Sequence, residues 1–142
     1  MPRAWRADHD VPWPLTERDA LQPARLFDLL AHVPVGRLTF TSGGRPAVSV
    51  VQHVVDGAGL LMRCPPHPGL VAAARAEQTT TFEADDLTGQ GGFGWWATAL
   101  GRVRLVDEDA PVDDHLLLTM NVTWMKGYVL PGDDRPGYRT AS

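Results

Sequence analysis

The sequence predicts a mainly β protein, a compact antiparallel β-barrel decorated by short helices. Apolar residues recur with a period of two over much of residues 35–106, which is typical of strands that bury one face. The expected elements follow the order helix, three strands, helix, two strands, and this is not the βαβ alternation of a parallel sheet. A chain of 142 residues with 44% apolar content is enough for one core and too short for two domains. We therefore expect residues 1–142 to form a single domain.

The N-terminal segment is expected to be an irregular arm followed by a helix. Residues 1–15 hold prolines and scattered charges, which give neither a helical nor a strand period. Residues 16–19 can cap or turn the chain into a first helix near 20–32. Leu26, Leu29 and Leu30 recur there at helical spacing, so one side of this helix should face a core.

Three strands follow the first helix. In residues 35–41, Leu38 and Phe40 point one way while Arg37 points the other. Glycine-containing turns at 42–45 and 56–59 lead into strands at 46–55 and 60–64. The sequence therefore predicts a three-stranded meander.

The second of these strands, PAVSVVQHVV, carries β-branched residues on both faces. A single small sheet cannot cover both faces of such a strand. The pattern favours a homodimer in which a second copy covers the outer face.

A second helix and two further strands continue the chain. Residues 67–77 have proline and glycine at their start and an alanine-rich interior, which is typical of a short helix. The strand expected at 79–85 places Thr80, Phe82 and Ala84 on one face.

The long strand expected at 95–106 follows a glycine-rich connection at 87–94. Its alternation places Arg102 and Arg104 on the same face as Trp96.

The final third has a weaker pattern. Residues 109–120 are compatible with a helix, residues 122–130 with a last strand, and a C-terminal tail is expected from about residue 131.

Composition excludes several classes of function. The net charge of −4 and the scattered basic residues argue against a nucleic-acid partner. The sequence has no apolar run near the ~18 residues of a membrane span, and the first residues lack the apolar core of a signal peptide. The single cysteine, Cys64, excludes an internal disulfide framework and fits a reducing compartment. We therefore expect a cytoplasmic protein without a membrane partner.

Known catalytic and metal-binding motifs are missing or out of context. Residues 89–94 match G-x-G-x-x-G, but strand residues follow instead of the helix that a dinucleotide site needs, so a hairpin loop is the better interpretation. The five histidines show no metal-ligand spacing, and no G-x-S-x-G is present. We expect no metal site, and the sequence identifies no catalytic residue.

One segment has the chemistry of a phosphate cradle. Residues 61–69 place Arg63 at the end of a strand, followed by a turn and the start of a helix. A strand-end guanidinium beside free helix N–H groups suits a phosphate. A solvated surface arginine is the alternative interpretation.

Three stretches together resemble the small FMN-binding split-barrel proteins related to pyridoxamine 5′-phosphate oxidase: residues 33–64, 67–86 and 94–106. The resemblance spans about residues 26–107. It implies an antiparallel split barrel, a homodimer with ligand sites at its interface, and FMN as the cofactor. It also implies a flavin-dependent oxidoreductase acting on a small organic molecule.

The same resemblance implies a set of cofactor-binding residues. They are Val48, Ser49, Val50, Val51, Gln52, Arg63, Cys64, His67 and Trp95. The residues of the second strand would lie along the isoalloxazine ring, largely through backbone groups. Arg63, with Cys64 beside it, would approach the phosphate, and the helix that begins at His67 would point its N-terminus there. Trp95 corresponds to the family's tryptophan at the start of the long strand.

The loop after Arg63 departs from the family pattern. Relatives commonly carry a lysine and a serine or glycine there, whereas this chain has His67, Pro68 and Gly69. Pro68 also lacks an N–H donor. A deazaflavin or another flavin is therefore an alternative cofactor. The alternative functions are a non-catalytic module that binds or senses a flavin, deazaflavin or haem, and a structural dimer without a ligand.

Overall fold

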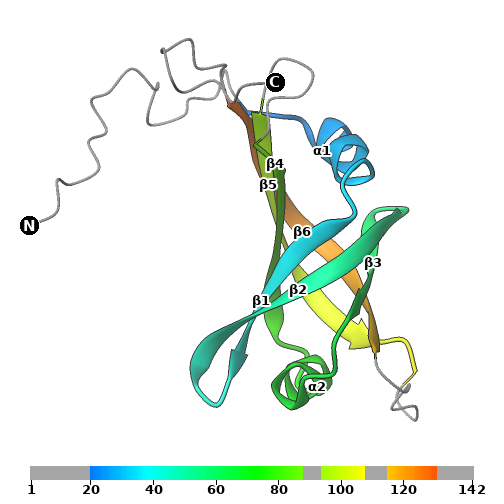
Figure 1. Ribbon diagram of the computed structural model, residues 1–142, viewed down its shortest axis with the longest axis vertical. Coiled ribbons are helices and arrows are strands. Elements are labelled where there is room, and N and C mark those ends of the chain that lie inside the picture. The colour runs from blue at the N-terminus through cyan, green and yellow to red at the C-terminus, as the bar shows by residue number, and fades with distance from the viewer. Residues whose placement is uncertain (1–19, 88–93, 108–114, 131–142) are drawn as a thin grey trace, which may run out of the picture.

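The computed structural model describes residues 20–87, 94–107 and 115–130. Their strands form a closed antiparallel barrel in the order β1-β2-β3-β6-β5-β4, with short helices at its two ends (Figure 1). This confirms the predicted fold class. The expected arm at 1–15, the tail from about 131, the G-x-G-x-x-G segment at 89–94 (apart from Gly94) and the single-domain boundaries stay predictions, because they involve residues outside those described.

The elements have the following bounds: α1 Pro23–Leu30, β1 Val35–Ser42, β2 Arg45–Asp56, β3 Gly59–Cys64, α2 Pro68–Arg75, β4 Thr79–Asp86, β5 Gly94–Leu105 and β6 Leu116–Leu130. The first helix begins after Gln22, three residues later than predicted, and Gln22 makes no side-chain cap. No helix within the described ranges is long and apolar enough to cross a membrane.

The predicted alternation of buried and exposed residues is confirmed along the strands. Leu38 and Phe40 of β1 point into the barrel, as does Phe82 of β4. Arg102 and Arg104 of β5 share its outer face with the half-buried Trp96. Gly43 and Gly44 form the β1–β2 turn at φ values of 58° and 76°, a conformation that side chains with a Cβ rarely adopt.

The prediction of a helix at 109–120 is wrong for residues 116–120, which the structure describes, because β6 begins at Leu116. Residues Leu116–Asn121 pair with β3, and Leu118 and Met120 alternate as buried residues with exposed Thr119. Three consecutive leucines hid this period of two in the sequence. The pairing partners on β3 and β5 decide the conformation.

His53 on β2 is a titratable side chain in the core. It is 6% exposed, its Nε2 lies 3.0 Å from the carbonyl oxygen of Leu30, and its ring packs edge-on against Phe82. Its buried Nδ1 has no hydrogen-bond partner within the described residues. Burial lowers the pKa of His53, and the hydrogen bond to Leu30 only partly opposes this. The folded protein therefore holds this imidazole neutral.

We expect the stability of the protein to fall with acidification below the ordinary histidine pKa of about 6.5. The unfolded chain then takes up a proton on His53 that the folded chain resists, at a slope of up to about 1.4 kcal/mol per pH unit. Urea unfolding at about pH 7.5 and about pH 5.5 measures the slope in the parent, in His53→Gln and in His32→Gln, where His32 is exposed. The slope should become shallower only in His53→Gln. An unchanged slope in that variant would assign the effect to other groups.

Candidate functional site

One edge of β2 has an open stretch of backbone. Residues 45–52 of β2 pair with β1 on one side. On the other side, the pairing with β3 begins only at Gln52, opposite Arg63. Residues 45–51 therefore have no strand neighbour on that edge among the described residues. Alternate N–H and C=O groups along such an edge are available to a ligand.

The residues of this strand divide between the two faces. Val48, Val50 and Gln52 point outward and are exposed, at 61% and 60% for the two valines. Val51 points inward and is fully buried, and Ser49 is half-buried. The outward side chains form a mostly apolar strip beside the open edge. Val51 can therefore meet a ligand only through its backbone.

Arg63 stands at the end of β3, next to this strip. Its Nε and Nη2 donate to Gln52 Oε1 at 3.2 and 2.8 Å. The contact holds the guanidinium over the outer face and leaves Nη1 without a partner among the described residues. The structure thus brings together Gln52 and Arg63, two of the predicted site residues.

Cys64 points the other way, into the core, and is buried. Burial raises the pKa of its thiol, and a hydrogen bond with Ser49 partly opposes the shift. The thiol is therefore a neutral packing group, and a ligand on the outer face would meet Cys64 only through its backbone.

His67 is the N-cap of α2. Its Nδ1 accepts a hydrogen bond from the backbone N–H of Leu70 at 3.3 Å, and its ring meets Phe40 edge-on at 4.9 Å. Because Nδ1 is the acceptor, the proton of a neutral ring lies on Nε2. The backbone N–H groups of Leu70 and Val71 both donate to the His67 carbonyl oxygen, so the first turn of α2 has little further donor capacity.

Ser42 is a residue that sequence reasoning missed. It ends β1, and a Cβ built on Gly69 would overlap its hydroxyl group, so Ser42 lies against the first turn of α2. Gly69 is required for this close approach. The loop at residues 67–69, which lacks the family's serine, therefore has the hydroxyl group of Ser42 beside it, from 27 positions before Gly69 in the chain. No local pattern in the sequence signals it.

The structure does not place Trp95 near Arg63 and His67. Arg63 pairs with Leu117, whose neighbour Leu118 pairs with Leu105 at the far end of β5. Trp95 lies ten residues before Leu105, or about 33 Å along the strand at ~3.3 Å per residue. Its side chain is also buried, at 4% exposure. Within one chain it is separate from Arg63 and His67.

The outward-facing tryptophan at that end is Trp96, whose ring lies 5.1 Å from the ring of Tyr128. The sequence pattern distinguishes the two tryptophans, because Trp95 lies at alternate positions with the buried Ala97 and Ala99 and therefore shares their inward face. The described residues contain no group of three or more histidine, cysteine, aspartate or glutamate side chains placed to hold a metal ion.

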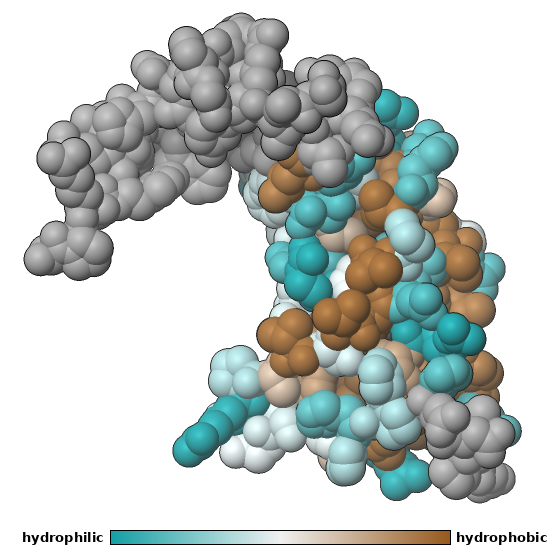
Figure 2. Space-filling view, viewed as in Figure 1, coloured by the Kyte–Doolittle hydropathy of each residue, from teal (hydrophilic) through white to brown (hydrophobic). Residues whose placement is uncertain are grey.

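An apolar surface surrounds the open edge. We call it the valine face and define it by its exposed or half-exposed apolar side chains on adjacent strands: Val48, Val50, Val54, Leu61 and Leu117. Figure 2 shows apolar side chains gathered over the part of the molecule where β1, β2 and β3 face the viewer in Figure 1. Arg37, paired with Glu83 and Asp85, forms a charged border on the β1–β4 side. An apolar centre with a charged border is typical of a protein interface.

Comparison with known proteins gives the following matches. The family model described as pyridoxamine 5′-phosphate oxidase matches residues 22–134. No curated protein matches the chain.

Solved structures share the fold. The FAD-binding protein of Mycobacterium smegmatis has a TM-score of 0.64 and 23% identity, over 80% of this chain and 98% of that one. An FAD-binding protein of Mesorhizobium loti has a TM-score of 0.65 and 16% identity, over 80% and 96%. The FAD- and haem-binding protein of M. smegmatis has a TM-score of 0.63 and 14% identity, over 82% and 77%.

Proposed function

The chain belongs to the pyridoxamine 5′-phosphate oxidase family, and on this premise we propose that it is a flavin-dependent oxidoreductase acting on a small organic molecule. The observation that carries the proposal is the open edge of β2, flanked by the outward strip and by Arg63. FMN is the cofactor that the resemblance implies, and a deazaflavin or another flavin is the alternative.

The residues at this edge fit a flavin. The backbone groups of residues 45–51 offer donors and acceptors to the polar edge of an isoalloxazine ring, and Val48 and Val50 offer apolar contact to its face. The Arg63 guanidinium, the Nε2–H of His67 and the hydroxyl of Ser42 lie at the same end of the barrel. These are groups that bind phosphate oxygens.

The side chains of this chain would bind and orient the cofactor. A bound flavin supplies hydride transfer, which no protein side chain provides. Gln52 holds the Arg63 guanidinium in place, and the Leu70 N–H holds the His67 ring so that Nε2 is its donor. Neither Arg63 nor His67 is assigned a role as general acid or base.

The second candidate is a non-catalytic module that binds a flavin, a deazaflavin or haem. The fold shared with proteins that bind FAD, in one case together with haem, supports both candidates. Steady oxidation of a reduced nicotinamide with an added electron acceptor separates them, because a binding module would not turn over.

We also propose that the protein is a cytoplasmic homodimer with its ligand sites at the subunit interface. The valine face supports this, since exposed apolar residues on adjacent strands are costly to leave in water. The separation of Trp95 and Trp96 from Arg63 supports it too, because a second copy can bring the far end of one barrel to the open edge of the other. Small-molecule substrates would then enter between the subunits.

The direct test is the absorbance spectrum of the purified protein before and after adding FMN. We expect a flavin spectrum that shifts on binding, together with quenching of flavin fluorescence. Parallel titrations with a deazaflavin and with haem identify the alternative cofactors. A protein that changes the spectrum of none of these ligands would be a structural dimer, and the proposed function would be wrong.

A further inference from the structure

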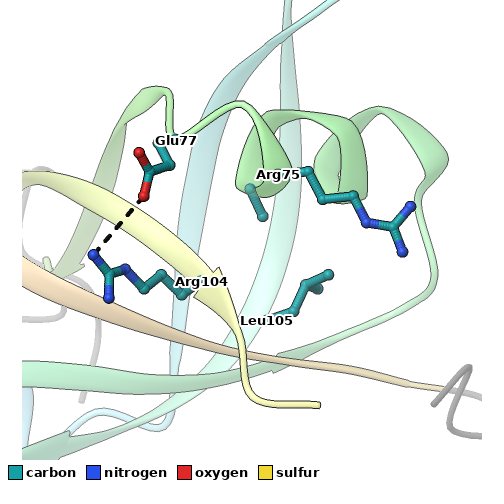
Figure 3. Close-up of a pocket in the computed structure, with 5 residues that line it drawn as sticks. Arg75, Glu77, Arg104 and Leu105 are labelled. Carbon is teal, nitrogen blue, oxygen red and sulfur yellow. Dashed lines mark ion pairs between the residues drawn. The ribbon is translucent and has the colours of Figure 1, made fainter. Parts of the chain in front are cut away.

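A pocket of about 310 Å³ lies between the end of α2 and the end of β5 (Figure 3). Residues from α2, from the turn after it and from β5 line the pocket: Ala74, Arg75, Glu77, Arg104 and Leu105. Its volume is near the lower limit of ligand sites, which suits a small molecule. None of these residues belongs to the proposed flavin site or to the valine face. Glu77 and His67 adjoin opposite ends of α2, which is about 12 Å long.

Glu77 has a backbone conformation that is unusual for its residue type. Its φ of 53° is the only positive value for a non-glycine residue among the residues that the structure describes. The N–H groups of Glu77 and Gln78 donate to the carbonyl oxygens of Ala74 and Ala73, which closes the end of α2. Glycine is the usual residue at this position, because a Cβ is unfavourable at positive φ. The chain therefore places a carboxylate at the pocket at an energetic cost, and such strain is typical of functional sites.

Glu77 meets Arg104 at one side of the pocket. Its Oε1 lies 3.9 Å from Arg104 Nη2, and the side chains of Arg104 and Glu77 are 74% and 59% exposed. Figure 3 shows the two side chains reaching toward each other, while Arg75 points away from both. Such a long, solvated ion pair contributes little to stability. The two charged groups can therefore separate and accept the opposite charges of a ligand.

The pocket offers one place for a cation and another for an anion. Glu77 carries its negative charge beside the C-terminal end of α2, where the helix dipole also favours a cation. The guanidinium of Arg104 has the fork of donors that suits a carboxylate. Ala74 and the half-buried Leu105 form the apolar part of the lining. A small molecule with an ammonium group, a carboxylate and an apolar group matches all three features.

We propose that this pocket binds a free α-amino acid with an apolar side chain. The ammonium group meets the carboxylate of Glu77, the carboxylate meets the guanidinium of Arg104, and the side chain lies against Ala74 and Leu105. The ligand thus replaces one weak contact by two ion pairs. A simple anion would leave Glu77 facing a like charge, and a simple amine would do the same to Arg104. The site does not depend on the flavin.

NMR titration of the isotope-labelled protein tests the proposal with L-leucine and two analogues, at matched pH and ionic strength. Isocaproate lacks the amino group of leucine, and isoamylamine lacks its carboxylate. We expect leucine to shift the resonances of Ala74, Glu77 and Leu105 with a dissociation constant of about 1–10 mM. Each analogue should bind at least about fivefold more weakly, because one of the two ion pairs is missing.

Three variants separate the two ion pairs. Arg104→Gln and Glu77→Gln should each weaken leucine binding about three- to tenfold. Glu77→Gln should also bind isocaproate more tightly than the parent does, because it removes the carboxylate that repels this anion. Arg102→Gln is the matched control, since Arg102 is exposed on the same face of β5 but does not line this pocket. It should change the leucine affinity less than about twofold.

Three outcomes would overturn the proposal. If isocaproate binds as tightly as leucine, the pocket is a simple anion site. If the leucine affinity is unchanged in both Arg104→Gln and Glu77→Gln, leucine binds elsewhere. If leucine shifts no resonance of the pocket at about 50 mM, the pocket is not an amino-acid site. FMN titration of the same variants should give the affinity of the parent, and a parent that does not bind FMN would contradict only the proposed function.

Discussion

Replacing Arg63 with alanine should weaken FMN binding about ten- to a hundredfold. A desolvated hydrogen bond between a guanidinium and a phosphate contributes about 1.5–3 kcal/mol. Arg63 is exposed in the free chain and its described contact is with Gln52, so the fold should tolerate the change. Riboflavin, which has no phosphate, should lose far less affinity. Fluorescence titration of both ligands at matched salt gives the comparison.

Gln52→Leu is the matched control for this prediction. It removes the hydrogen-bond partner that positions Arg63 but keeps the guanidinium charge. We expect it to keep most of the FMN affinity, with a loss smaller than that of Arg63→Ala. Equal losses of FMN and riboflavin affinity in Arg63→Ala would show that the residue acts through the shape of the site and not through phosphate.

Placing a carboxylate on the valine face should convert the protein to monomers. Val54 is 57% exposed in the single chain and is not among the proposed flavin contacts. In Val54→Glu, each subunit would bury an unpaired carboxylate at a cost of at least about 2 kcal/mol. The substitutions in the two subunits together should weaken the free energy of association by about 4 kcal/mol, which is about a thousandfold in the dissociation constant. Sedimentation over a range of protein concentrations measures this directly.

Leu87→Glu provides the comparison, because Leu87 is 61% exposed but lies beyond β4, outside the valine face. It should leave association unchanged. Flavin binding should fall in Val54→Glu as the dimer dissociates, although Val54 does not touch the proposed ligand. A parent protein that sediments only as a monomer would contradict both the dimer and the shared ligand site. A dimer that persists in Val54→Glu would place the interface on another face.

The strands and the barrel were predictable because local signals agreed with the final packing. Leu38, Phe40 and Phe82 occupy alternate positions in segments bounded by turn residues, and each lies in the core. The prediction failed at Leu116–Met120, where three consecutive leucines satisfy helical and strand periods equally well. Pairing with β3 and β5 resolved that choice, and pairing partners are not visible in a local pattern.

The sequence by itself determined the barrel, the position of Arg63 at a strand end and the position of His67 at a helix start, because these depend on periodicity and on residues next to one another. Only the tertiary structure decided what surrounds them. It places Ser42 against Gly69, it sets the ring of Trp96 beside that of Tyr128, and it leaves residues 45–51 of β2 without a strand neighbour on one edge. Each of these depends on strand register and on contacts between residues far apart in the chain. Closing the barrel sets that register, because a slip of one residue would turn every buried side chain of a strand outward.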